Sequence, residues 1–397
     1  GAGLSTLEVA LTSAMCQPQM HIAAGQAGRG SPGWSGTPPG PREGRWLLAF
    51  VLLGAVLTAC VSVPEGPGSA PDARDRAFSA PAAWHHLQAL TQIGTRQTGT
   101  RGSARARKYL RQRLEDLGAN VEELTLRTLS EDDEASEATH LVATLPGESS
   151  DRFLLAASYD TRALPGIEFV GANASASGPA LVLELARVLS QRPRAYTVVV
   201  ALVDGDLLPA IRPGGRFPGS RSFASWLADG GDGGFAKIRF AVFFQQVADL
   251  DLSIARDLRS HPIYREFFWE AARALGRGIY FPGDANVESV DAGHLEFIDR
   301  GLLRTVVISD PRYGGSDVPG RYAGSDQDTV EHCSRDSLGI VGDVTLEALD
   351  RISAQLARID RFHRSPLGAP PGTTGPTPAR VADPAAAQVA DDESALH

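Results

Sequence analysis

The feature that most constrains the fold of this chain is a series of short segments between residues 153 and 223. Residues 153–157 form a short apolar run, and residues 197–203 form a second one. Between these runs, apolar residues recur at i, i+4, i+7 and i+8 from Leu181, which is the period of an α-helix. A strand, a turn, a helix and a strand in this order predict a βαβ unit, whose parallel strands are buried on both faces.

Each of the two predicted strands runs directly into polar residues. Ser158, Tyr159 and Asp160 come after the first strand, and Asp204 and Asp206 come after the second. In open parallel sheets, ligands bind in a crevice beyond the carboxyl ends of the strands. We therefore expect the functional site at that edge of the sheet.

Five short motifs lie at these strand ends and turns, and they follow one another in a fixed order. They are Ser158-Tyr159-Asp160, Gly171-Ala172-Asn173-Ala174-Ser175-Ala176-Ser177-Gly178, Asp204-Gly205-Asp206-Leu207, Gly219-Ser220-Arg221 and the segment 322–329. They resemble motifs of the zinc-dependent aminopeptidase and glutaminyl cyclase family, which read His-x-Asp, Gly-Ala-Asn-Asp-x-Ala-Ser-Gly, Asp-Gly-Glu-Glu, Gly-Ser-Arg and Tyr-x-His-Thr-x-x-Asp-Thr. The resemblance implies an α/β fold, a doubly wound, mostly parallel twisted sheet flanked by helices, over about residues 78–362.

Members of this family hold zinc through two His and three carboxylates, and a neighbouring Glu acts as the base. The resemblance places those five ligand positions, in chain order, on Ser158, Ala174, Leu207, Gln245 and Gly324. Zinc in proteins takes thiolate, imidazole or carboxylate ligands, and none of these five side chains offers one. We therefore expect no zinc, no cofactor and no catalysis, with Asp206 at the vestigial base position and Asp160 beside it.

Without a metal, the site is expected to be a crevice that binds a peptide or a partner protein, and a purely structural envelope protein with no ligand is an alternative that the sequence does not separate from it. The resemblance predicts that it is lined by Ser158, Tyr159, Asp160, Asn173, Asp206 and Gln245. Two of them have a simpler explanation as well: Asp160 accepts backbone N–H groups at a strand end, and Tyr159 is a packed aromatic with a hydrated hydroxyl.

Other polar residues near the motifs are expected to be structural. Arg221 is predicted to form an ion pair or to bind carbonyl groups, His332 to lie at the surface, and Cys333 to be buried near the start of the last helix. A replacement nucleophile at Ser158 or Ser175 would need a His base within reach, and the chain has no Gly-x-Ser-x-Gly motif.

The N-terminal part carries a second signature. Residues 1–44 are rich in Gly, Pro and Ser and are expected to be disordered or an upstream extension. Residues 45–60 combine a basic start, a short apolar run and the sequence Leu57-Thr58-Ala59-Cys60. This resembles a bacterial lipoprotein signal, in which the Cys is acylated; a plain secretory signal or a short membrane helix are the alternatives. The apolar run is too short to span a bilayer.

The remaining boundaries follow from composition. Residues 61–77 are predicted to be a flexible tether, residues 78–362 the folded domain and residues 363–397 a disordered tail. With a net charge of −9 and no dense basic run, the chain is not expected to bind nucleic acid. The leading hypothesis is thus a lipid-anchored protein of the bacterial cell envelope, with its domain outside the cytoplasm. The competing hypothesis is an active aminopeptidase or glutaminyl-peptide cyclotransferase with a different, zinc-binding ligand set.

Overall fold

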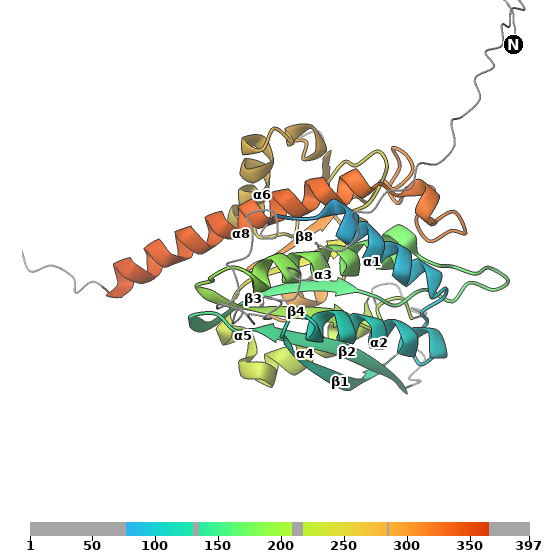
Figure 1. Cartoon of the computed structure of the whole chain (residues 1–397), viewed down its shortest axis with the longest axis horizontal. Coiled ribbons are helices and arrows are strands. Elements are labelled where there is room, and N and C mark those ends of the chain that lie inside the picture. Colours follow the sequence, from blue (N-terminus) through green and yellow to red (C-terminus); the bar gives the residue numbers. More distant parts are fainter. Residues whose placement is uncertain (1–76, 130–134, 209–216, 284–285, 365–397) are drawn as a thin grey trace, which may run out of the picture. The chain divides into compact units, whose positions relative to one another are not determined.

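The computed structural model describes residues 77–129, 135–208, 217–283 and 286–364. These residues form an α/β domain around a six-stranded sheet of order β1-β2-β4-β3-β5-β8 (Figure 1). The predicted signal, tether and tail (residues 45–60, 61–77 and 363–397) lie outside the described residues, apart from Ala77 and the last turn of the final helix. Among the described helices, none is long and apolar enough to cross a membrane.

The sheet is mixed, with its parallel strands in the centre. β3 (Ser149–Ser158) lies between β4 (Tyr196–Val203) and β5 (Ile238–Gln245) and is parallel to both, and β5 pairs in parallel with β8 (Thr305–Ser309). At the other side, β2 (Ala135–Leu145) is antiparallel to β4 and to the edge strand β1 (Asn120–Leu129). The prediction of a mostly parallel sheet is confirmed.

The central strands are wholly apolar because both faces of the sheet are covered. In β3, Phe153 and Leu155 pack on one face, while Leu154 and Ala156 pack on the other. Burying a Leu or Phe side chain contributes about 1.5–3 kcal/mol, so the sheet centre stabilises the domain strongly.

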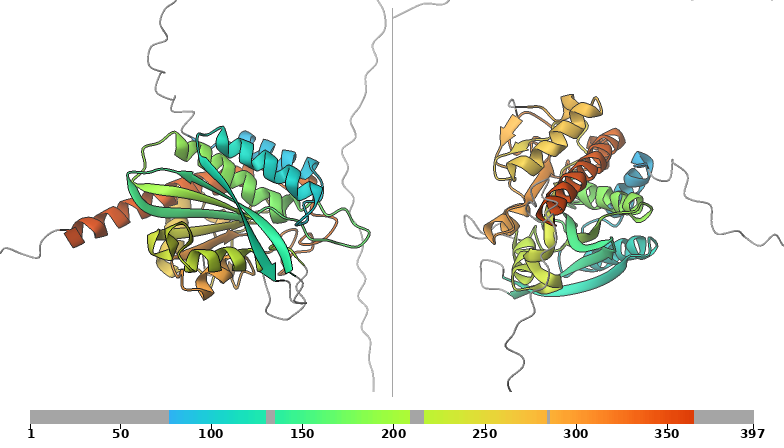
Figure 2. Two further views of the ribbon diagram at one scale, coloured as in Figure 1. Left: turned by 90° about the horizontal axis from the view of Figure 1, so that it is seen from below. Right: turned by 90° about the vertical axis from the view of Figure 1, so that its left-hand side faces the viewer.

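Helices cover the two faces unequally (Figure 2). One face carries α1 (Ala80–Gln92), α2 (Arg101–Glu115), α3 (Ser177–Ser190), α6 (Pro262–Ala274) and α8 (Arg335–Arg364). The opposite face carries α4 (Pro218–Ala228), α5 (Gly234–Lys237) and α7 (His294–Asp299). A small two-stranded sheet, β6 (Arg256–Asp257) with β7 (Val287–Glu288), lies outside the main sheet.

Local sequence explains where several helices begin. The side chains of Ser79 and Thr100 accept backbone N–H groups at the starts of α1 and α2, and Ser334 does the same at the start of α8. The glycine-rich segment 171–178 is more regular than expected. It forms a π-helical turn, Ala172–Ala176, that runs directly into α3, and a turn of this kind often marks a functional site.

Candidate functional site

The carboxyl ends of four strands lie along one edge of the sheet, as the sequence predicted. Ser158 at the end of β3 lies beside Val203 at the end of β4, and Gln245 at the end of β5 lies beside Ser309. Parallel pairing forces these ends to the same edge, which is the usual position of a ligand crevice. Ser158 and Gln245 are partly exposed there.

Asp206, at the predicted base position, is enclosed by hydroxyl groups. Its carboxylate accepts hydrogen bonds from the Ser158 hydroxyl, from the Ser220 hydroxyl at 2.7 Å and from the Ser220 backbone N–H at 2.6 Å. Burial raises the pKa of Asp206 to about 6, although these donors act in the opposite direction. The side chain is therefore fixed by hydrogen bonds and almost inaccessible to solvent.

Gly293 closes this network from the other side. A Cβ at this position would lie 2.2 Å from Ser220 Oγ and 2.9 Å from Asp206 Oδ2. Since real Cβ atoms do not approach other atoms so closely, only glycine fits here without a shift of the network. The backbone of Gly293, just before α7, thus packs directly against the Asp206 carboxylate, and no space is left between them for a side chain at position 293.

Asp160 is fully buried, so it does not line the crevice as predicted, and it supports the turn that follows β4. Its carboxylate accepts the backbone N–H groups of Asp206 at 3.2 Å and Leu207 at 2.7 Å, which is the structural role expected from the sequence. Burial and the nearby carboxylates of Asp204 and Asp206 hold the pKa of Asp160 well above its usual range. Asp204 in turn accepts hydrogen bonds from the Thr98 hydroxyl and the Thr139 backbone N–H.

The π-helical turn is held by Asp328, from the motif 322–329. Its carboxylate accepts the backbone N–H groups of Asn173 at 2.7 Å and Ala174 at 3.1 Å. Burial raises the pKa of Asp328 to about 6. The Asn173 side chain accepts the Ala248 N–H at 2.8 Å and is fully buried, so it braces the turn against the segment after β5 and does not line an open crevice.

Arg96 is one residue whose role the sequence reasoning missed. Its fully buried guanidinium donates to the carbonyls of Tyr159, Leu90, Gly94 and Val170 at 2.9–3.1 Å, and to Ser175 Oγ at 2.9 Å. Burial lowers the pKa of Arg96 to about 10, opposed by the charges of Asp328 and Asp160. Arg is normally found at the surface. The segment Gly94-Thr95-Arg96 resembles the start of the family's opening helices, but that resemblance gave Arg96 no role at the site.

Tyr159 does not line the crevice, and the expectation of a hydrated hydroxyl is wrong. Its ring is fully buried, and its hydroxyl donates to the Thr139 carbonyl at 2.7 Å. The buried ring of His140 is a second unpredicted feature of this region; its Nδ1 lies 3.3 Å from the Asp204 N–H, and burial lowers its pKa to about 3. Both side chains pack under the strand ends and face away from solvent.

The other polar residues have the expected structural roles. Arg221 forms an ion pair with Glu296 at 3.3 Å. His332 is partly exposed and stacks on Tyr322 with ring centroids 3.9 Å apart, and Cys333 is buried beside Tyr313.

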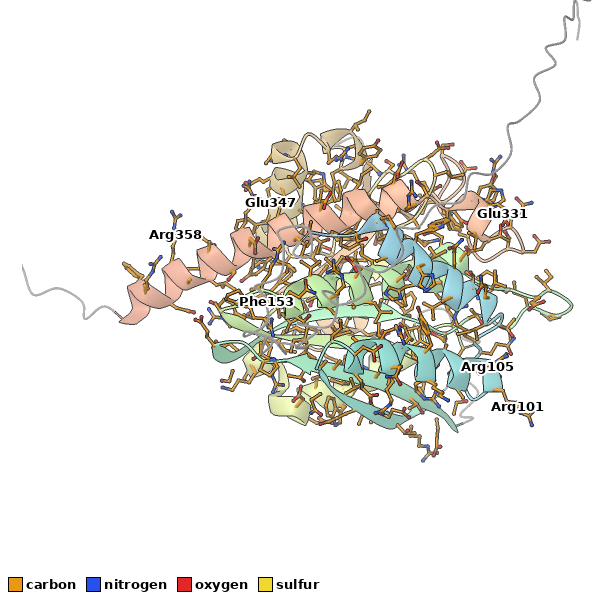
Figure 3. The ribbon with its side chains drawn as sticks, in the orientation of Figure 1. Arg101, Arg105, Phe153, Glu331, Glu347 and Arg358 are labelled. Atoms are coloured by element: carbon orange, nitrogen blue, oxygen red, sulfur yellow. The ribbon has the colours of Figure 1, made fainter. Side chains whose placement is uncertain are left out.

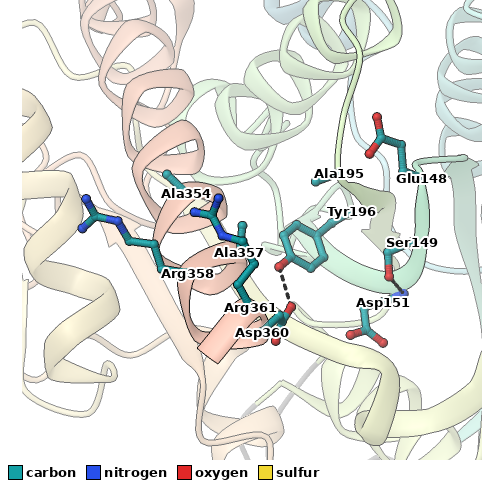
Figure 4. A pocket seen from close by; sticks show the side chains of 10 residues that line it. All are labelled: Glu148, Ser149, Asp151, Ala195, Tyr196, Ala354, Ala357, Arg358, Asp360 and Arg361. Atoms are coloured by element: carbon teal, nitrogen blue, oxygen red, sulfur yellow. Dashed lines mark hydrogen bonds between the residues drawn. The ribbon is translucent and has the colours of Figure 1, made fainter. Parts of the chain in front are cut away.

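A separate groove of about 620 Å³ lies at the opposite, amino end of β3 and β4, against the last turns of α8 (Figure 4). Two of its carboxylates, those of Asp151 and Asp360, are paired with Arg239. Arg239 binds Asp151 at 2.8 Å and Asp360 at 2.9 Å, and the Tyr196 hydroxyl donates to Asp360. This network ties α8 to the sheet and is distant along the strands from the predicted crevice.

Comparisons with known proteins agree with this geometry. The profile of "Peptidase family M28" matches residues 140–349, which is more than half of the chain. The chain belongs to peptidase family M28. The matched residues include the strand ends, the π-helical turn and the Asp206 network of the M28 domain.

Relatives of known structure share the fold over almost their whole length. A glutaminyl cyclase from an Acidobacteriales bacterium is 26% identical, with a TM-score of 0.65, and the match covers 73% of this chain and 99% of that one. A Zn-dependent exopeptidase from Parabacteroides distasonis is 21% identical, with a TM-score of 0.60, and the match covers 70% and 98%. The glutaminyl-peptide cyclotransferase of Drosophila melanogaster is 32% identical over 97 residues, which are 24% of this chain and 27% of the relative.

The side chains at the five ligand positions do not fit a zinc ion. Ala174 and Leu207 supply only hydrocarbon, and the Leu207 N–H is already bound to Asp160. Gly324 has no side chain, Ser158 donates its hydroxyl to Asp206, and Gln245 offers a neutral amide. Within the residues that the structure describes, no three His, Cys, Asp or Glu side chains form a group that could hold a metal ion.

Proposed function

We propose that this protein is a lipid-anchored member of family M28 in the bacterial cell envelope, which has lost zinc and catalysis and binds a peptide or a protein partner in the remaining crevice. The observation that carries the proposal is the enclosure of Asp206. In a hydrolytic site the base must reach a water molecule or a substrate proton at about 2.6–3.2 Å. Here Ser158, Ser220 and the backbone at Gly293 occupy that space.

The donor set supports the same conclusion independently. A catalytic zinc needs three protein ligands and an open position, and the five family positions offer no carboxylate or imidazole. Without a metal ion to act as a Lewis acid, and with Asp206 enclosed, partly exposed polar groups such as Ser158 and Gln245 are left at this edge of the sheet for contact with a ligand. Such groups suit hydrogen bonding to a peptide backbone.

The alternative is an active aminopeptidase or glutaminyl-peptide cyclotransferase with a different ligand set. It is favoured by the 26% identity to a glutaminyl cyclase that matches over its whole length. Such an enzyme would bind metal and lose activity with a chelator, which distinguishes it from the leading proposal.

Metal content is the measurement that separates the two. The purified protein should carry less than ~0.1 zinc per chain after dialysis, because the five positions lack ligands. A micromolar site at ~100 μM zinc would stabilise the native state by about 2.7 kcal/mol. For a domain of this size that corresponds to a rise in Tm of roughly 4–5 °C. We expect no rise, and no chelator-sensitive release of amino acids or cyclisation of N-terminal glutaminyl peptides.

Restoring the ligands provides the positive control. The variant combines Ser158→His, Ala174→Asp, Leu207→Glu, Gln245→Asp and Gly324→His. Gly324 has φ of +68°, so a His there is strained by about 1–2 kcal/mol. A matched variant without the change at position 324 therefore shows whether that strain limits zinc binding. Near-stoichiometric zinc in the unaltered protein would overturn the proposal.

A further inference from the structure

The strand β1 forms one edge of the sheet. It is ten residues long, pairs with β2 alone in the six-stranded order, and lies at the lower margin of the domain in Figure 1. The view from below in Figure 2 shows this margin facing the reader. An edge strand of this length presents backbone N–H and C=O groups that are able to pair with a further strand.

The contacts of Thr139 show which groups of β1 point outward. Thr139 lies opposite Thr125, and its N–H donates to Asp204 while its C=O accepts the Tyr159 hydroxyl, both on the side away from β1. Thr125 and Thr139 are therefore a non-hydrogen-bonded pair, and their hydroxyl oxygens lie 3.1 Å apart. In such a pair the backbone groups of the two residues point away from each other.

It follows that the backbone N–H and C=O groups of Thr125, and of the alternate residues Glu123 and Arg127, lie in the plane of the sheet and point away from β2. Val121 belongs to the same alternate set of residues. Its carbonyl also points away from β2 and accepts a hydrogen bond from Arg111 Nη1 at 3.4 Å. The outer edge of β1 thus offers a regular row of donors and acceptors.

The side chains of β1 are complementary to those of a second, antiparallel copy. With a two-fold axis at Thr125, Glu123 of each copy lies opposite Arg127 of the other, on the face that carries α2. The Glu123 carboxylate is already oriented there by Arg111 at 2.9 Å and Arg107 at 3.4 Å. On the opposite face the half-buried Leu124 would lie beside Leu126 of the other copy.

We propose that the domain forms a two-fold dimer through antiparallel pairing of β1 with β1 of a second copy, centred on Thr125. The two sheets become one continuous sheet, and each dimer gains two cross-strand Glu–Arg pairs. A peptide strand of another protein would satisfy the outward backbone groups equally well. The charge complementarity at positions 123 and 127 is what favours a second copy of this chain.

Disulfide cross-linking of the full chain tests the register. In the proposed dimer the two copies of residue 125 form a hydrogen-bonded pair with Cα atoms about 5.5 Å apart, within disulfide range. Thr125→Cys should therefore give a covalent homodimer after mild oxidation. Arg127→Cys is the matched control, because its two copies would be about 14 Å apart along the strand. Equal yields from the two variants, or a mixed disulfide at position 125 with another polypeptide, would overturn the proposal.

Charge reversal tests the pairing without any new cysteine. Arg127→Glu alone and Glu123→Arg alone each place like charges opposite one another twice, so each should weaken the homodimer at least about tenfold. A mixture of the two variants restores both opposite-charge pairs in a heterodimer. Sedimentation velocity or native mass spectrometry should show monomers separately and a heterodimer on mixing. Two variants that dimerise alone as strongly as the unaltered chain would refute the assignment.

Discussion

Replacement of Arg96 by Met should destabilise the domain more than any other change of an arginine near the crevice. Arg96 connects the segment before α2 to the turn after β3 and to the π-helical turn, through the carbonyls of Tyr159 and Val170 and the hydroxyl of Ser175. Met has a similar length but donates no hydrogen bond, so it leaves these buried acceptors without their donor.

The magnitude follows from the number of buried acceptors. Each buried polar group left unpaired costs about 1–3 kcal/mol, and such costs are not fully additive within one network. With at least two carbonyls bound at 2.9 Å, we expect a loss of about 3–5 kcal/mol in the free energy of unfolding. That is a large share of the 5–15 kcal/mol that stabilises a typical domain, and it corresponds to a fall in Tm of roughly 5–8 °C.

Arg105 is a matched control because it also donates to a backbone carbonyl, that of Ile93 at 3.3 Å, but from an exposed position (Figure 3). Arg105→Met should change stability by no more than about 0.5 kcal/mol. Arg96→Lys keeps the charge but not the planar fork of donors, so it should recover only a small part of the loss. Urea unfolding monitored by tryptophan fluorescence measures all three. A loss below about 1 kcal/mol in Arg96→Met, or an equal loss in Arg105→Met, would refute the reasoning.

Three further outcomes are expected. Because burial raises the pKa of Asp206 to about 6 in the native state, above about 3.9 in an unfolded chain, its effect favours folding at low pH and is lost as pH rises through about 6. Urea unfolding gives the free energy of unfolding at about pH 5 and about pH 7.5. The loss of this free energy between the two pH values should be about 1–1.5 kcal/mol larger in the unaltered protein than in Asp206→Asn. An identical pH dependence in the two proteins would contradict this. Cys60→Ser should abolish labelling with a radioactive fatty acid, and unchanged acylation would exclude the lipoprotein signal. Limited proteolysis should leave a core of about residues 78–362, and two separable cores would count against one folded unit.

The sequence alone determined the βαβ unit and the edge of the sheet that carries the predicted crevice, and the resemblance predicts that the family's zinc-ligand positions carry no zinc ligand here. These features are local: the period of apolar residues decides strand or helix, and parallel strands place their carboxyl ends together. Ser158, Ala174 and Leu207 could be assigned because each lies inside a short motif whose spacing is unchanged.

The tertiary structure decided which polar groups are accessible. Asp328 and Asn173 are 155 residues apart, and Arg96 and Ser175 are 79 apart, so no local pattern connects them. The sequence predicted that Tyr159, Asp160, Asn173 and Asp206 would line a crevice, yet the chain segments that converge on them bury all four almost completely. Burial depends on how distant segments pack, and it sets both the hydrogen-bond partners and the pKa of each group. For that reason the enclosure of Asp206, on which the proposed loss of catalysis depends, is visible only in the folded chain.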